Sequence, residues 1–183
     1  MKRSLLLLLL TSVLTLLFSC DETEKEKVPE KESKIIKEPA KAIDACSILD
    51  KSDIEKIFNT KMKEPKEGRS QEGGINNISF SECSFESDTE GSKIYLSIYI
   101  RFSPFNSDAY STMRSVRNSF KQSGIETYNV DGVGDVAFWG GNQLHVFFDE
   151  DYYFIITLLG LRDQYAAIEK SKIVALKIAE NIK

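Results

Sequence analysis

Alternation of apolar and other residues along the chain is clearest between Ile94 and Phe102. The side chains divide between two faces, one with Ile94, Leu96, Ile98, Ile100 and Phe102 and the other with Tyr95, Ser97, Tyr99 and Arg101. A period of two is typical of a strand with one buried face. The apolar segments 136–139, 143–148 and 152–159 are separated by short turns, so they predict a three-stranded meander.

Apolar residues at helical spacing occur in three segments. They lie at about 52–59, from Ser107 or Asp108 to Gly124, and from about Asp163 onward. At the start of the first segment, Ser52 and Glu55 have the spacing of a capping box, in which each side chain accepts a hydrogen bond from the first turn. These positions predict a short helix, a longer middle helix and a C-terminal helix.

The region before residue 94 is less regular. Residues 61–77 are polar and contain three glycines, which predicts a loop with room for one short edge strand. Ile78 and Phe80 then alternate out of phase with Cys83 and Phe85. This slip predicts a bulge near Ser81 and Glu82.

The predicted order is helix, two strands, helix, three strands, helix (α-β-β-α-β-β-β-α). Strands come in groups and do not alternate regularly with helices. This arrangement predicts an α+β fold, with a mainly antiparallel sheet and the helices packed on one face.

The average composition of the 183 residues is that of a soluble globular protein, with 42% hydrophobic residues, 28% charged residues and a net charge of −4. It excludes a multi-span membrane protein, a collagen-like repeat and a strongly basic nucleic-acid binder. The long apolar run and the densest charged run both lie within the first 41 residues. We therefore expect three parts: 1–19, 20–41 and a single domain over 42–183, the last with a net charge of −5 and no cluster of bases for nucleic acid.

The first part has the layout of a secretory signal peptide. Lys2 and Arg3 precede an uncharged run over 5–18, which is shorter than the roughly 20 residues of a spanning helix. The residues Leu17-Phe18-Ser19-Cys20 resemble the lipobox of bacterial lipoproteins. The resemblance implies removal of residues 1–19, acylation of Cys20 (palmitate included) and anchoring to a bacterial membrane, facing the periplasm or the exterior. The alternative is an ordinary signal peptide with Cys20 as a spare thiol. Asp21 follows Cys20 directly, at a position that matters for lipoprotein sorting. The sequence does not decide whether the anchor lies in the inner or the outer membrane.

The second part is expected to be a flexible, charged tether. Residues 21–41 hold seven acidic and six basic residues, together with two prolines and few large apolar residues. Such a segment buries too little surface to offset the entropy of ordering it. Its balanced charge is unlike that of a polybasic lipid-binding patch.

Cys46 and Cys83 are the only cysteines left in the third part. Because the signal directs the domain to an oxidising compartment, a disulfide between them is the leading interpretation. A redox or metal site would need a C-x-x-C pair or further ligands, and the sequence has neither. We expect no metal and no cofactor.

The candidate recognition face lies on the aromatic-rich meander and comprises Trp139, His145, Phe147 and Tyr153. His145 is the only histidine of the chain, and no nucleophile or orienting carboxylate is marked beside it. A surface or hydrogen-bonded sheet position is therefore the simpler interpretation. The run Gly132-Val133-Gly134-Asp135 precedes strands and not a helix, so it predicts a backbone turn and not a phosphate loop.

A second resemblance involves three short stretches: Asp44-Ala45-Cys46-Ser47-Ile48-Leu49, Cys83-Ser84-Phe85, and Val133-Gly134-Asp135-Val136-Ala137-Phe138-Trp139. Together, across about 44–159, they resemble small secreted bacterial lipoprotein domains of unassigned function. The resemblance implies the fold and the disulfide. It carries over no catalytic residue.

These features predict a non-enzymatic, lipid-anchored binding or interaction module of the cell envelope. Its ligand is not identified by the sequence, and a protein is one possible partner. An alternative is an inhibitor or immunity protein that blocks an envelope enzyme or toxin through an acidic and aromatic face, for which a basic partner is expected. A hydrolase of envelope polymers is the third candidate. It would need carboxylates such as Asp135, Asp149 and Asp151 to converge in a cleft.

Overall fold

The computed structural model describes residues 43–89, 93–104 and 106–182. The signal peptide at 1–19, Cys20 and the tether at 20–41 therefore lie outside the described residues. Among the helices in the described ranges, none combines the length and apolar character needed to cross a membrane.

The described elements are three α-helices, seven strands and one 3-10 turn. In chain order they are α2 (Lys51–Phe58), β1 (Lys66–Gln71), η2 (Ile75–Asn77), β2 (Ser79–Glu86), β3 (Tyr95–Phe102), α3 (Asn106–Gln122), β4 (Thr127–Asn129), β5 (Val136–Gly140), β6 (Gln143–Phe148), β7 (Tyr152–Leu159) and α4 (Gln164–Ile182). The predicted α+β class and the predicted order of elements are confirmed. Strand β1 occupies the 61–77 region, where the sequence left room for one edge strand, and the structure adds the short strand β4.

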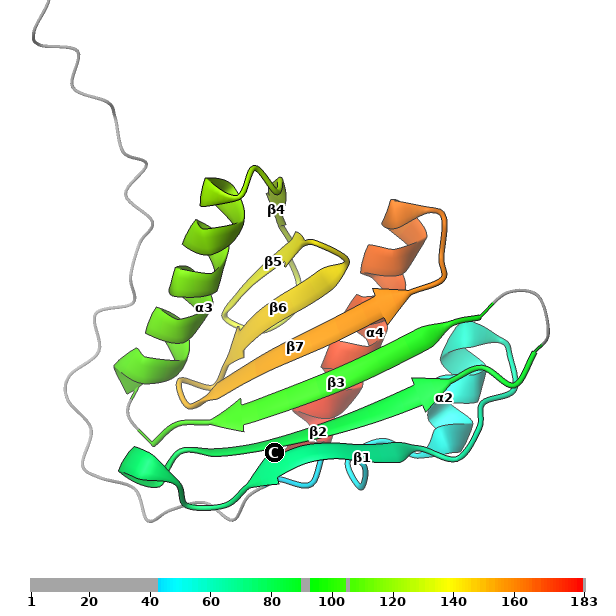
Figure 1. Ribbon diagram of the computed structural model, residues 1–183, viewed down its shortest axis with the longest axis horizontal. Helices are drawn as coiled ribbons and strands as arrows, with labels where there is room; N and C mark the ends of the chain where they lie inside the picture. The colour runs from blue at the N-terminus through cyan, green and yellow to red at the C-terminus, as the bar shows by residue number, and fades with distance from the viewer. Residues whose placement is uncertain (1–42, 90–92, 105, 183) are drawn as a thin grey trace, which may run out of the picture. The chain divides into compact units, whose positions relative to one another are not determined.

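All seven strands form one antiparallel sheet in the order β1-β2-β3-β7-β6-β5-β4 (Figure 1). Strands β1 and β4 are its two edges. In the centre, β3 pairs with β7 from Tyr95 opposite Leu159 to Phe102 opposite Tyr152. An early meander of three strands is thereby joined to a late meander of four.

The helices cover both faces of the sheet, so the prediction that they pack on one face is wrong for α3. Helices α2 and α4 pack with the main core, whereas α3 packs with a smaller cluster that contains Phe138, Phe147 and Tyr153. The cause is that the late strands are apolar on both faces. Phe154 and Ile156 alternate with Tyr153 along β7 and face the main core. Two apolar faces need helices on both sides.

The bulge lies in β1 and not in β2. Strand β2 pairs with β3 without a break, while the register of β1 shifts between Glu67 and Ser70. The apparent slip in the sequence arises because serines occupy the buried face of β2 and Phe80 lies on the other face. One of them, Ser81, accepts a hydrogen bond from the backbone N–H of Ala45 at 2.9 Å, which satisfies a buried hydroxyl.

The predicted capping box at α2 is also wrong. Asp50 is the N-cap residue and makes no side-chain capping bond. Glu55 instead accepts a hydrogen bond from the backbone N–H of Met62 at 3.0 Å, and this bond, with the nearby Lys61 ammonium, lowers the pKa of the Glu55 carboxyl. The glutamate thus fixes the chain that leaves the helix.

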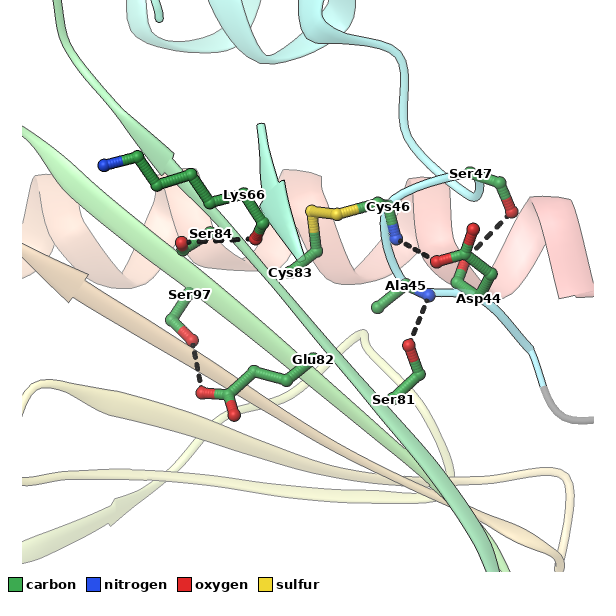
Figure 2. Close-up of a disulfide and its surroundings, with 10 residues drawn as sticks. All are labelled: Asp44, Ala45, Cys46, Ser47, Lys66, Ser81, Glu82, Cys83, Ser84 and Ser97. Atoms are coloured by element: carbon green, nitrogen blue, oxygen red, sulfur yellow. Dashed lines mark hydrogen bonds between the residues drawn. A yellow bond between two sulfur atoms is a disulfide. The ribbon is translucent and has the colours of Figure 1, made fainter. Parts of the chain in front are cut away.

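The disulfide between Cys46 and Cys83 is confirmed. Figure 2 shows it joining the segment before α2 to β2, with the two Cα atoms 5.0 Å apart. Asp44 accepts a hydrogen bond from the backbone N–H of Cys46 at 2.9 Å. At the other end of the chain, the Asn181 amide donates to the carbonyl oxygen of Ile48 at 2.7 Å. The N-terminal segment is therefore held by both β2 and α4.

The predicted turn before β5 is present. Gly132 and Gly134 both have positive φ, at 80° and 64°. A Cβ atom at position 134 would lie 2.5 Å from the carbonyl oxygen of Phe147, so the close approach of the turn to β6 requires glycine there.

Candidate functional site

The predicted recognition face is not exposed. Trp139, His145, Phe147 and Tyr153 keep 2%, 1%, 5% and 1% of their surface accessible. Helix α3 covers the cluster that contains Phe147 and Tyr153, and Trp139 points to the opposite face, into the main core. The aromatic residues of the meander are therefore packing residues, because both faces of this part of the sheet are covered.

His145 is a buried member of the interior beneath α3. Its Nδ1 atom lies 2.6 Å from the Tyr153 hydroxyl oxygen, at hydrogen-bond distance. Its ring stacks on Phe138 with centroids 4.4 Å apart, and Phe120 of α3 meets it edge-on. Burial lowers the pKa of His145 to about 4, so the imidazole is neutral at pH 7.

A groove of about 300 Å³ lies along the edge of the area of the sheet that α3 covers. Thr112 and Val116 of α3 form one wall, and the floor comes from β3, β7 and Gln143 of β6. Arg69, at the bulge of β1, and Glu82 of β2 form the opposite rim. We call this feature the α3 groove. It lies on the face of β2 and β3 that bears Phe80, Tyr99 and Arg101, which are partly exposed there.

The centre of the groove floor is aromatic. The ring of Tyr99 lies against that of Phe80, with centroids 5.8 Å apart and planes inclined by 28°. Beside it, Tyr153 and Ile155 of β7 also line the floor. Burial raises the pKa of both the Tyr99 and the Tyr153 phenols, so both remain neutral at pH 7.

The charged side chains around the groove stand in pairs. Arg69 Nε lies 3.5 Å from Glu82 Oε2 at the rim, and the Ser97 hydroxyl donates to the other oxygen of Glu82 at 3.3 Å. At the end near α3, an Arg101 guanidinium nitrogen lies 2.6 Å from Asp108 Oδ2. Burial of Asp108 opposes its ionisation, but hydrogen bonds from Arg101 and Ser103 outweigh this effect and lower the pKa of its carboxyl.

Neutral hydrogen-bonding groups complete the lining. The Gln143 amide donates to the Thr157 hydroxyl at 3.2 Å, and Thr112 contributes a hydroxyl from α3. The groove thus combines an aromatic ring, hydroxyls and an amide with internally paired charges. Such a lining suits reversible binding.

Further hollows in the described part of the chain include one at the bulge of β1 and one beside the start of α4. None of the three is lined by Asp135, Asp149 or Asp151. Asp149 is exposed, whereas Asp151 is 3% exposed. Within the described ranges, no three His, Cys, Asp or Glu side chains gather as metal ligands do.

The residues that β3 contributes to the groove floor could have been identified from the sequence. Ser97, Tyr99 and Arg101 occupy the face of the 94–102 strand opposite its apolar residues. A tyrosine and an arginine on the face opposite the apolar residues of a strand indicate a face that the main core does not bury. The part that α3 contributes is not readable from the pattern, because it depends on which face of the sheet the helix covers.

Comparisons with protein-family models, with curated proteins and with solved structures found no match for this chain.

Proposed function

We propose that this protein is a lipid-anchored lipoprotein of the bacterial cell envelope whose folded part is a non-enzymatic binding module, with the α3 groove as its ligand site. The observation that carries the proposal is the groove itself. Tyr99 is partly exposed on its floor of strands, beside the wall that α3 forms. Ligand sites of proteins are concave, partly apolar surfaces with a few placed polar groups.

The protonation states in the groove favour binding over acid–base catalysis. Asp108 is held as a carboxylate against Arg101, and the phenol of Tyr99 keeps its proton at pH 7. A general base needs a pKa near the working pH and a free path to the substrate proton. These groups are better suited to orient a ligand than to react with it.

The anchor rests on the resemblance of Leu17-Phe18-Ser19-Cys20 to a lipobox. Several acyl chains hold a protein on a membrane more firmly than one, since each buried methylene contributes about 0.8 kcal/mol. We expect the wild-type protein to sediment with membranes and Cys20→Ala to be recovered in the soluble fraction, as measured by fractionation and immunoblotting. Membrane association that survives this substitution would contradict the anchor. Separation of inner and outer membranes then identifies which of them holds the wild-type protein.

The binding site is tested by photo-crosslinking in the producing cell. A photoreactive amino acid that replaces Arg69 of the full chain stands at the groove rim, because the Arg69 side chain is 82% exposed. We expect a light-dependent adduct from this position. The matched control replaces Tyr165, which is 72% exposed on α4 and does not line the groove, and it should give none. Equal adducts at both positions, or none at Arg69, would count against the groove as the ligand site.

A further inference from the structure

The charge pairs of the α3 groove bear on the chemistry of its ligand. An anion would have to displace Glu82 from Arg69 or Asp108 from Arg101, and a cation would have to displace the arginines. Breaking the Arg101–Asp108 pair leaves one member without its partner, which costs binding free energy, and the more exposed Arg69–Glu82 pair adds a smaller cost. The groove therefore complements a ligand without net charge.

The uncharged polar groups that line the groove are suited to hydrogen-bond the hydroxyl groups of a ligand. Ser97, Thr112 and Thr157 have side-chain hydroxyls, which both donate and accept, and Gln143 adds an amide with both functions. A ligand rich in hydroxyls can exchange donor and acceptor roles with every one of them. An acyl chain would cover these groups without using their remaining hydrogen-bonding capacity, at a cost in free energy.

The aromatic floor requires a ligand that also has apolar faces. The Tyr99 ring is supported by Phe80 and flanked by Ile155 and Val116. Aromatic faces carry partial negative charge and attract C–H groups that approach them. A sugar ring combines C–H groups on its faces with hydroxyls around its edge, so it matches both the ring of Tyr99 and the polar groups beside it.

The strand floor argues against an extended peptide. Strand β3 is paired with β2 on one side and with β7 on the other, so its backbone groups are engaged in the sheet. A peptide in the groove could not add to the sheet as a further strand, which is the usual way of binding one to a sheet through its backbone.

We infer that the α3 groove binds a neutral sugar ring of a glycan, stacked on Tyr99 and hydrogen-bonded to the hydroxyl and amide groups of β3, β6, β7 and α3. This inference rests on the proposed function as a binding module and names its ligand class. The volume of about 300 Å³ lies at the lower end of that of ligand pockets, which suits a short stretch of the polymer.

The test is calorimetric titration of the full chain with cellotetraose, maltotetraose and chitotetraose, and with tetragalacturonate as an anionic counterpart. We expect at least one neutral oligosaccharide to bind at millimolar concentration or below and tetragalacturonate to bind more weakly. Tyr99→Leu keeps an apolar side chain but removes the ring, and should weaken binding about tenfold. Thr112→Trp fills the groove from α3 without altering the sheet and should abolish binding.

Ser111→Trp is the matched control, since Ser111 is exposed on the same helix and does not line the groove; its affinity should equal that of the wild type. The inference is overturned if no neutral oligosaccharide binds, if tetragalacturonate binds best, or if Tyr99→Leu and Thr112→Trp both bind like the wild type. An adduct of other chemistry in the photo-crosslinking experiment would overturn the glycan inference and leave the binding module standing. If the photoreactive group at position 69 also gives no adduct, the glycan inference and the proposed binding module are both contradicted.

Discussion

Replacing Cys46 and Cys83 together by alanine is expected to lower the free energy of unfolding by about 4 kcal/mol. The two residues are 37 positions apart, and a bridge over such a distance restricts the unfolded chain considerably. Alanine is the suitable replacement because Cys83 is fully buried in the main core, where a serine hydroxyl would need a partner. Urea denaturation monitored by circular dichroism measures the loss.

Cys20→Ala is the control for this experiment, because it removes a cysteine that lies outside the described residues and should leave the midpoint unchanged. A loss below about 1 kcal/mol in the double variant would show that the bridge does not restrict the unfolded chain as the loop-entropy account requires. Free thiols in the protein purified without reductant would contradict the bridge itself.

The stability of the protein is expected to fall as the pH drops below 6.5, and His145 is the cause. Burial lowers the pKa of its imidazole from 6.5 to about 4 in the folded chain. Below pH 6.5 the unfolded chain therefore binds a proton that the folded chain excludes, and the stability present above pH 6.5 is lost progressively down to about pH 4. Between pH 7 and pH 5 the loss should be about 2 kcal/mol, since one pH unit corresponds to about 1.4 kcal/mol.

His145→Gln isolates this contribution. Its amide can still hydrogen-bond the Tyr153 hydroxyl, but it does not titrate, so the decline between pH 7 and pH 5 should largely disappear. The chosen range lies above the ordinary pKa values of the carboxyls, whose own losses come at lower pH. Because the chain has one histidine, its proton resonance in NMR can be followed without assignment, and it should not shift between pH 8 and pH 5. An unchanged pH dependence in His145→Gln would refute this account.

Residue periodicity predicted the elements better than it predicted their surroundings. Strand β3 was clear because every second residue from Ile94 to Phe102 is apolar and buried. Strand β2 was misleading because Ser79 and Ser81 occupy its buried face and Phe80 does not. The period of a strand reports a face only where hydrophobicity and burial coincide, and hydrogen-bonded serines break that coincidence.

The candidate site shows the same limit at the level of packing. Phe147, Tyr153 and His145 were expected on an open face because one covered face is the norm for an antiparallel sheet. Helix α3 covers them, and the partly exposed face lies around Tyr99 of β3, the strand next to the one that holds Tyr153. The sequence holds the aromatic residues of both regions. The position of helix α3 on the sheet decides which of these residues remain at the surface.

The bridge between Cys46 and Cys83 also limits how far the chain lengthens under a pulling force. With the bridge intact, the residues between the two cysteines cannot be drawn out, which shortens the fully extended chain by about 130 Å at roughly 3.5 Å per residue. A pull applied at Asp44 passes through Ala45 to Cys46 and then reaches β2 through the bridge (Figure 2). With the proposed anchor at Cys20, β2 and the part of the groove rim that Glu82 forms would stay linked to the membrane through the bridge even while the rest of the sheet gave way.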